Sequence, residues 1–316
     1  MIADTIKIAS RNSPMAMWQA NLVKNKLLEF FPQHGFEIIG IATSGDKDTT
    51  KPLQQLGGKN LFVKELQQAL LDNEADLAVH CVKDMSVHPI PQLTIACYLT
   101  RDDPRDALLS LHDHTLETLP SQAVVGTSSP RRTGLLKRAR PDLRIKPLRG
   151  NVNTRINKLM AGEYDAIILS SAGLSRLGLT QHIQQYLPTD SFLPAIGQGA
   201  LAIECLRSNN VIQNMVNTLH DPSTATCIEA ERAVNRLLQG DCHSAIGAYC
   251  QQHSNALTLT AMVASTCGKE YIDATANGAV NDCLLLGKTV AKKLLDKGAK
   301  KILDNNTNRP STSSST

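Results

Sequence analysis

Residues 6–31, IKIASRNSPMAMWQANLVKNKLLEFF, and residues 123–139, AVVGTSSPRRTGLLKRA, follow the same plan. Each begins with a short apolar run, passes through a turn of small polar residues, and enters a helical pattern at a Ser-Pro pair. Serine at the N-cap and proline in the first helical turn are strong helix-start signals. The same order of strand, turn and helix, found twice, suggests two α/β units that are diverged copies of one another.

A second pair of stretches repeats in the same way. Residues 66–84 and 156–174 both run from a helical pattern through a short turn into an apolar strand led by an aspartate, Asp76 or Asp165. Alternating helices and short strands predict α/β units with parallel sheet. Two such lobes would bind a ligand in the cleft between them, at the carboxyl ends of the strands.

The last third of the chain has a different pattern. A helix is predicted over residues 224–239, then three antiparallel strands beginning near residues 246, 256 and 269, and a final helix near 280–298. This order is typical of a small α+β module with its helices on one face of the sheet. We therefore expect a first lobe of residues 1–99 with 197–220, a second lobe of 100–196, and an α+β domain of 221–304. The polar tail, 305–316, is expected to be disordered.

Charge is concentrated in one segment. The whole chain carries a net charge of +4, yet residues 131–155 contain nine Lys or Arg and one acid, Asp142. Arginines beside a helix N-terminus form a good site for carboxylates or phosphates, because free N–H groups and guanidinium forks both bind anions. The alternative is a solvated basic helix face. The segment contains no aromatic residue for stacking on bases, which disfavours a nucleic-acid partner.

Composition places the protein among cytoplasmic globular proteins. No apolar run is long enough for a membrane helix, and the first ten residues do not resemble a signal peptide. The eight cysteines include no C-x-x-C pair, which argues against a zinc site or a disulfide framework. His112 and His114 lie in a polar loop without a partner motif, so we expect no metal.

One cysteine is in an unusual position. The stretch LLQGDCHSAIGAYC, residues 237–250, puts Cys242 in a tight turn between a helix and a strand. A thiol there could be a structural accident, a nucleophile beside His243, or the anchor of a covalently bound group. Adjacent residues rarely point their side chains at each other, and no orienting acid is evident, which weighs against the nucleophile.

Several stretches together resemble one family. They are SRNSPMAMWQA, GGKNLFVKELQQALL, ADLAVHCVKDM, VVGTSSPRR, LRGNVNTR, LSSAGLSRLG, LPAIGQGALAIEC and the ERA…GDC segment, in order from about residue 4 to about residue 303. They are similar to the porphobilinogen deaminases, also called hydroxymethylbilane synthases. The resemblance implies a monomeric transferase that joins four porphobilinogen molecules head to tail into the linear tetrapyrrole hydroxymethylbilane, for haem biosynthesis. It also implies two lobes like those of periplasmic binding proteins, with a small α+β domain that carries the cofactor cysteine.

The resemblance further implies a role for individual residues. Cys242 would hold a dipyrromethane primer through a thioether, and Asp84 would be the catalytic carboxylate. The expected cofactor contacts are Lys83, Ser129, Arg131 and Arg132. The expected substrate contacts are Arg11, Ser13, Arg149, Arg155 and Arg176. Taken alone, Asp84 would be a strand-end turn residue, Arg131 and Arg132 solvated helix charges, and Arg149 and Arg155 partners of loop carbonyls.

The chain departs from the family pattern at a few positions. Gln55 stands where a lysine is common, Asn60 where a glycine is usual, and Asp241 makes GDC from the frequent GGC. Met85-Ser86 replaces a common apolar-Pro pair. We expect these changes to affect loop behaviour and rate more than the reaction. A non-catalytic two-lobed receptor for a small polyanion is the main rival, and it gives Asp84 and Cys242 no task.

Overall fold

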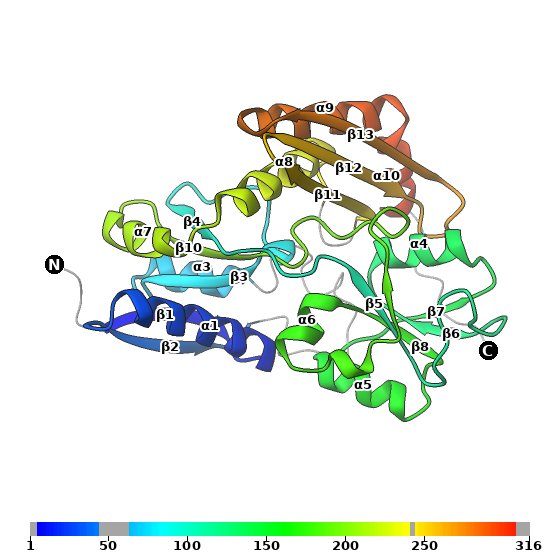
Figure 1. The fold of residues 1–316 in the computed structure, drawn as a ribbon, viewed down its shortest axis with the longest axis horizontal. Helices are drawn as coiled ribbons and strands as arrows, with labels where there is room; N and C mark the ends of the chain where they lie inside the picture. The colour runs from blue at the N-terminus through cyan, green and yellow to red at the C-terminus, as the bar shows by residue number, and fades with distance from the viewer. Residues whose placement is uncertain (1–4, 44–62, 241–243, 308–316) are drawn as a thin grey trace.

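The computed structural model describes residues 5–43, 63–240 and 244–307, which form three sheets with their covering helices. Two five-stranded sheets build two lobes, and a three-stranded sheet builds a third domain. Figure 1 shows the lobes next to each other below the third domain. The predicted fold class, two α/β lobes with a small α+β domain, is confirmed. Within the described residues, no helix is both long and apolar enough to cross a membrane.

The first lobe has the strand order β2-β1-β3-β10-β4. Its elements are β1 (Thr5–Arg11), α1 (Pro14–Phe30), β2 (Gly35–Ile41), α3 (Lys64–Leu71), β3 (Leu77–Cys81), the short 3-10 helix η2 (Val82–Asp84), β4 (Leu93–Tyr98), β10 (Leu201–Leu206), α7 (Asn210–Val216) and η4 (Asn217–Leu219). Strands β1, β2 and β3 are parallel, while β10 is antiparallel to both β3 and β4.

The second lobe repeats this topology with the order β7-β6-β8-β5-β9. Its elements are β5 (Asp106–Ser110), β6 (Val124–Gly126), α4 (Pro130–Ala139), β7 (Arg144–Lys146), α5 (Val152–Met160), β8 (Ala166–Ser170), α6 (Ser171–Arg176), η3 (Thr180–His182) and β9 (Gln185–Leu187). Strand β5 is antiparallel to β8 and β9, as β10 is to β3 and β4. The two copies that the sequence suggested are therefore present as matching sheets.

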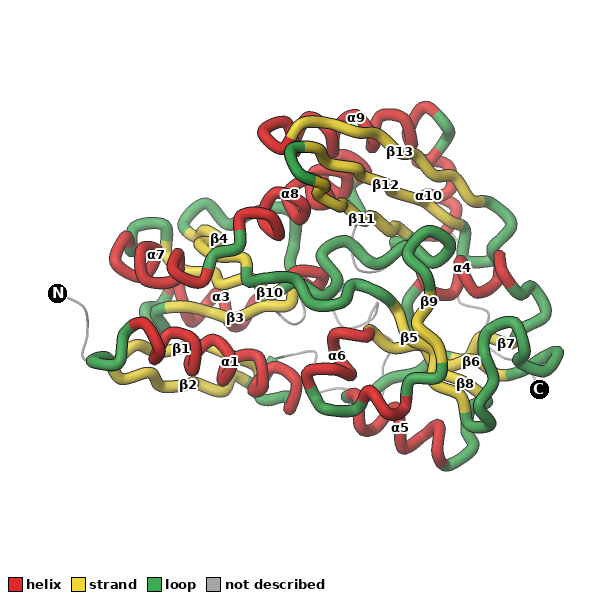
Figure 2. Tube along the Cα trace, in the orientation of Figure 1, coloured by secondary structure: helices red, strands yellow, loops and turns green. Residues whose placement is uncertain are grey.

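The expectation of parallel sheet is correct for the pairing of three strands in each lobe and wrong for both pairs that the reversed strand, β10 or β5, makes with its neighbours. The reason is the path of the chain between the lobes. The chain crosses from the first lobe to the second just before β5 and returns to the first lobe just before β10. Each of these two strands therefore enters its sheet from the end opposite to that of its neighbours. Figure 2 shows the two connections as green loops, and the Asp102 N–H donates to the Gly199 carbonyl at 3.2 Å between them.

The third domain packs its helices on one face of a meander. Its elements are α8 (Pro222–Leu238), β11 (Ile246–His253), β12 (Ala256–Ala264), β13 (Tyr271–Ala279), η5 (Val280–Asp282), α9 (Cys283–Asp296) and α10 (Ala299–Thr307). Gly287 allows α8 and α9 to approach closely, because a Cβ there would lie 2.4 Å from the Ala230 carbonyl oxygen. Helix α10 continues to Thr307, past the expected start of the tail at 305, and the rest of that tail lies outside the described residues.

Candidate active site

A cavity of about 740 Å³ lies where the two lobes and the third domain meet. It is lined from the first lobe by the ends of β1 and β3, from the second by the starts of α4, α5 and α6, and from the third by α8 and the start of β11. All the predicted site residues that the structure describes line this one cavity: Arg11, Ser13, Lys83, Asp84, Ser129, Arg131, Arg132, Arg149, Arg155 and Arg176. The sequence elements that resembled one family are thus brought together in space.

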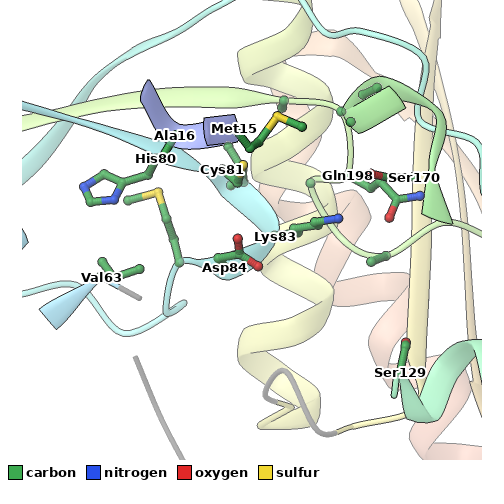
Figure 3. Close-up of a pocket in the computed structure, with 18 of the residues that line it drawn as sticks. Met15, Ala16, Val63, His80, Cys81, Lys83, Asp84, Ser129, Ser170 and Gln198 are labelled. Atoms are coloured by element: carbon green, nitrogen blue, oxygen red, sulfur yellow. The ribbon is translucent and has the colours of Figure 1, made fainter. Parts of the chain in front are cut away.

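Lys83 and Asp84 occupy the turn that follows β3. The 3-10 turn is closed by the Met85 N–H, which donates to the Val82 carbonyl at 3.1 Å. Both side chains are half-buried, and Figure 3 shows them extending into the cavity. Burial lowers the pKa of Lys83, while the charge of Asp84 partly opposes this change. The turn therefore presents a cation and an anion together at the carboxyl end of a central strand.

The two repeated helix starts also face the cavity. The Ser13 hydroxyl accepts the Ala16 N–H at 3.3 Å, and the Ser129 hydroxyl accepts the Arg132 N–H at 3.4 Å. Each serine is the N-cap residue and each is followed by proline, so the predicted helix starts are confirmed. A helix N-terminus offers unpaired N–H groups and the positive end of the helix dipole, which favour an anion.

Arg131 and Arg132 are buried and converge on one carboxylate. Their Nη2 atoms lie 2.7 and 2.6 Å from the two oxygens of Asp106, a side chain with no exposed surface. The Gln198 amide donates to the same carboxylate at 3.0 Å. Burial would raise the pKa of Asp106, but the two arginines outweigh it and hold that pKa at about 2. The alternative reading of both arginines as solvated helix charges is wrong.

The other arginines are positioned by backbone carbonyls and a second acid. Arg176 donates from Nε to Asp102 and from Nη2 to the Gly199 carbonyl, each at 2.7 Å. Arg155 lines the cavity and donates from Nε to the Gly150 carbonyl of its own loop at 2.7 Å. Burial, followed by the neighbouring charges of Arg132 and Arg149, lowers the pKa of Arg155 to about 10.

Charge in the cavity is almost all of one sign. The described lining residues include eight Lys or Arg and a single Asp or Glu, which is Asp84. The cations are Arg11, Lys83, Arg131, Arg132, Arg149, Arg155, Arg176 and Arg232. The Nε of Arg131 is buried and has no hydrogen-bond partner. This donor set fits a ligand with several carboxylates.

Four important residues were not predicted from the sequence. Asp102 pairs with Arg176 and Asp106 pairs with Arg131 and Arg132, while Gln198 donates to Asp106 and Arg232 reaches the cavity from α8. Asp106 had a usable signal, because an acid that begins a largely buried strand must have a strong partner. Gln198 and Arg232 had no such signal, since their contacts connect segments far apart in the sequence.

Some predicted positions lie outside the described residues. These are Gln55, Asn60, Asp241, Cys242 and His243. The residues on either side of the last three, Gly240 and Ser244, both line the cavity. Within the described part of the chain, no cluster of three or more His, Cys, Asp or Glu could hold a metal ion.

Two α/β lobes around a cationic cavity, completed by a small third domain, define the class of two-lobed proteins that hold a polycarboxylate between their lobes. Residues 6–214 match the family model described as porphobilinogen deaminase, dipyromethane cofactor binding domain, and residues 225–296 match the porphobilinogen deaminase C-terminal domain. The chain belongs to the porphobilinogen deaminase family. Its reaction is that of a hydroxymethylbilane synthase, a transferase that polymerises porphobilinogen in tetrapyrrole biosynthesis with a dipyrromethane cofactor.

Similar proteins cover almost the whole chain. The porphobilinogen deaminase of Methylobacillus flagellatus is 44% identical over 299 residues, which is 95% of this chain and 96% of the relative. That of Legionella pneumophila strain Lens is 44% identical over 304 residues, 96% of this chain and 98% of the relative. Among solved structures, the methionine binding protein MetQ aligns with 68% of this chain and 90% of its own, at a TM-score of 0.45 and 13% identity.

Proposed function

We propose that Asp84 is the catalytic carboxylate of this reaction and that Cys242 anchors the growing chain. The observation that carries the first part is the isolation of Asp84, the one acid among eight cations on the described cavity wall. A cavity built to hold carboxylates would exclude an acid that had no chemical task. The polyanion receptor would not need Asp84 at all.

The proposed role of Asp84 is electrostatic. Porphobilinogen loses its aminomethyl nitrogen as ammonia, which leaves a cation delocalised over the pyrrole ring. A carbon of the chain's last pyrrole then forms the new C–C bond and afterwards gives up its proton. A fixed carboxylate near the ring nitrogen stabilises the cation more than the neutral substrate, and it also provides a proton acceptor. The charge of Asp84 raises the pKa of both Lys83 and Arg155, which supports a role for it close to these two cations.

We divide the site residues into a cofactor group and a substrate group, as the family resemblance implies. The contacts of Arg131, Arg132 and Arg155 agree with this division, whereas Arg176, which Asp102 holds, does not follow it. Arg131 and Arg132 are fixed by the buried Asp106, which suits a ligand that stays bound, and so we assign them with Lys83 and Ser129 to the cofactor. Arg155 is held by a carbonyl of its own loop, which suits carboxylates that change place as the chain grows. We assign it to the substrate together with Arg11, Ser13, Arg149 and Arg176. Arginine suits this work because its planar fork matches a carboxylate with two hydrogen bonds.

When bound, dipyrromethane supplies the pyrrole carbon on which the chain is extended. This chain's part is to hold the carboxylates of that group and to keep water from the reacting carbon. We further propose that the protein is a cytoplasmic monomer that binds small molecules rather than nucleic acid. The described cysteines form no disulfide with one another, as is usual in cytoplasmic proteins, and Arg131 and Arg132 point inward rather than onto a basic surface. Gel filtration of the purified protein tests its monomeric state.

The anchor is tested by intact mass. The purified holoprotein should be heavier than its chain by two linked pyrrole units, and Cys242→Ser should abolish this excess. Cys267→Ser is the matched control, because Cys267 is a partly exposed thiol that does not line the cavity. An adduct that survives in Cys242→Ser and moves to another thiol would contradict the assignment.

The role of Asp84 is tested by single-turnover ammonia release from cofactor-loaded protein. Asp84→Asn keeps the size but removes the charge, so substrate should bind while release slows by about 10²–10³-fold. Asp84→Glu keeps the charge and displaces it by one methylene, so it should retain more activity than Asn. Release from Asp84→Asn at the wild-type rate would show that Asp84 is structural.

A further inference from the structure

Arg232 is a buried cation of the cavity wall that the roles above do not use. It lies on α8 in the third domain and is 4% exposed. Among the described lining residues, it is the one Lys or Arg that the third domain supplies. Its position raises the question of what a charge buried this deeply does beside the site.

The side chain of Arg232 holds the turn that carries Asp84. Its Nη2 donates to the Ser86 carbonyl at 2.8 Å, across 146 residues of sequence. Ser86 is two residues beyond Asp84, and the buried side chains of Val82, Met85 and Val87 fix the segment around it. Figure 3 shows Lys83 and Asp84 in front of the pale yellow helix α8. The hydrogen bond therefore connects the third domain to the backbone just after the catalytic turn.

The charge of Arg232 is poorly compensated. Its Nε is buried without a hydrogen-bond partner among the described residues, and the carboxylate oxygen that it faces there, on Glu229, is 3.8 Å away. Glu229 already accepts the Tyr98 hydroxyl at 2.6 Å and the Arg236 Nη2 at 2.7 Å. A buried cation with so little compensation costs stability. Folding stability alone therefore does not account for an arginine at this position.

We propose that Arg232 is a positioning residue for Asp84, which ties the catalytic turn to helix α8 through the Ser86 carbonyl. The inference rests on the proposed catalytic role of Asp84. Its physical basis is the sensitivity of electrostatic catalysis to distance. A carboxylate displaced by about 1 Å from a developing cation can cost about 10²-fold in rate. In the third domain, α8 is followed in the chain by the segment that contains Cys242. The hydrogen bond of Arg232 therefore also connects the turn of Asp84 to the domain that carries the proposed anchor.

The test uses three variants of the cofactor-loaded full chain. Arg232→Met removes the donor and the charge, and Arg232→Lys keeps the charge and a flexible donor. Arg236→Met is the matched control, because Arg236 is one turn further along α8, pairs with Glu229 at 2.7 Å, and has a side chain that is 39% exposed. Intact mass first establishes that each variant carries the cofactor. If the Met variant does not fold or load, the Lys variant is measured by the same criteria.

Two readouts separate positioning from simple binding or packing. Arg232→Met should lower kcat by about 10- to 100-fold with little change in KM for porphobilinogen, and Lys should recover part of the loss. Amide hydrogen exchange over residues 82–88 should accelerate in Arg232→Met and stay unchanged in Arg236→Met. A rise in KM with unchanged kcat, or unchanged exchange over this segment, would overturn the proposal.

A double variant links the effect to Asp84. If Arg232 acts through Asp84, Arg232→Met should slow ammonia release little further in the Asp84→Asn background. An equally large loss in both backgrounds would overturn the inference. The two proposals fail separately. If Asp84→Asn releases ammonia at the wild-type rate, the catalytic role of Asp84 is wrong. If Asp84→Asn is slow but Arg232→Met releases ammonia at the wild-type rate, only the positioning role of Arg232 is wrong.

Discussion

Replacing Asp106 by asparagine should destabilise the protein far more than the loss of one charge from a surface ion pair would. Asp106 accepts Arg132 at 2.6 and 3.0 Å and Gln198 at 3.0 Å on one oxygen, and its other oxygen is 2.7 Å from Arg131. Asparagine supplies one acceptor, and its amide group would face a guanidinium donor. Two buried arginines would then lack a counter-ion.

The magnitude follows from burial and from the pKa. The fall of the Asp106 pKa from 3.8 to about 2 corresponds to roughly 2 kcal/mol of stabilisation by its charged form. Leaving the partners of a buried pair uncompensated costs more, about 3–5 kcal/mol. We therefore expect Asp106→Asn to lower the free energy of unfolding by about 3–5 kcal/mol near neutral pH. Because the folded pKa is depressed, the difference from wild type should be full above about pH 4 and should fade as the pH falls toward about 2.

The assay is urea unfolding followed by circular dichroism at several pH values. The matched control is Asp103→Asn, because Asp103 makes a 2.8 Å ion pair with Arg105 whose side chains are 29% and 42% exposed. That surface pair should be worth at most about 1 kcal/mol despite its similar length. Equal losses from the two variants, or a loss for Asp106→Asn that persists at about pH 2, would refute the reasoning from burial.

Two further predictions concern the arginines and the inter-lobe crossing. Arg131→Leu should yield apo-protein that lacks the mass of the cofactor, whereas Arg155→Leu should carry the cofactor and stall during chain elongation. Full turnover in both variants would show that the basic segment does not bind ligand carboxylates. Gly199→Ala should lower the urea midpoint, because Gly199 has φ +88° and a Cβ there would lie 2.5 Å from the Asp102 carbonyl oxygen. Gly162→Ala, at φ +76° with open space around it, should lower that midpoint less, and the reverse order would show that crowding at the crossing is not the cause.

The local pattern of this sequence was a reliable guide wherever short-range physics decides the conformation. The Ser13-Pro14 and Ser129-Pro130 pairs begin α1 and α4 as predicted, because N-cap hydrogen bonds and the proline φ angle act within one helical turn. The alternating runs after residue 245 form the three-stranded meander for the same reason. The resemblance of ordered motifs also predicted the family, which the comparisons confirm.

Those patterns did not show the direction of β10 in the first lobe or of β5 in the second. An apolar run such as ALLS, residues 107–110, reads the same in a parallel or an antiparallel sheet. The path of the chain between the lobes decides its direction, and that path depends on packing between segments distant in sequence. The sequence showed strands, and the tertiary structure decided their order and sense.

By itself, the sequence predicted which residue types line the cavity: a basic segment, two helix starts, and the Lys83-Asp84 turn. It did not determine what stands behind them. The tertiary structure alone decided that Asp106 holds Arg131 and Arg132, and that Arg232 reaches the Ser86 carbonyl. The physical reason is that a buried charge is stable only with a partner, and in this protein each of those partners comes from a distant segment of the chain.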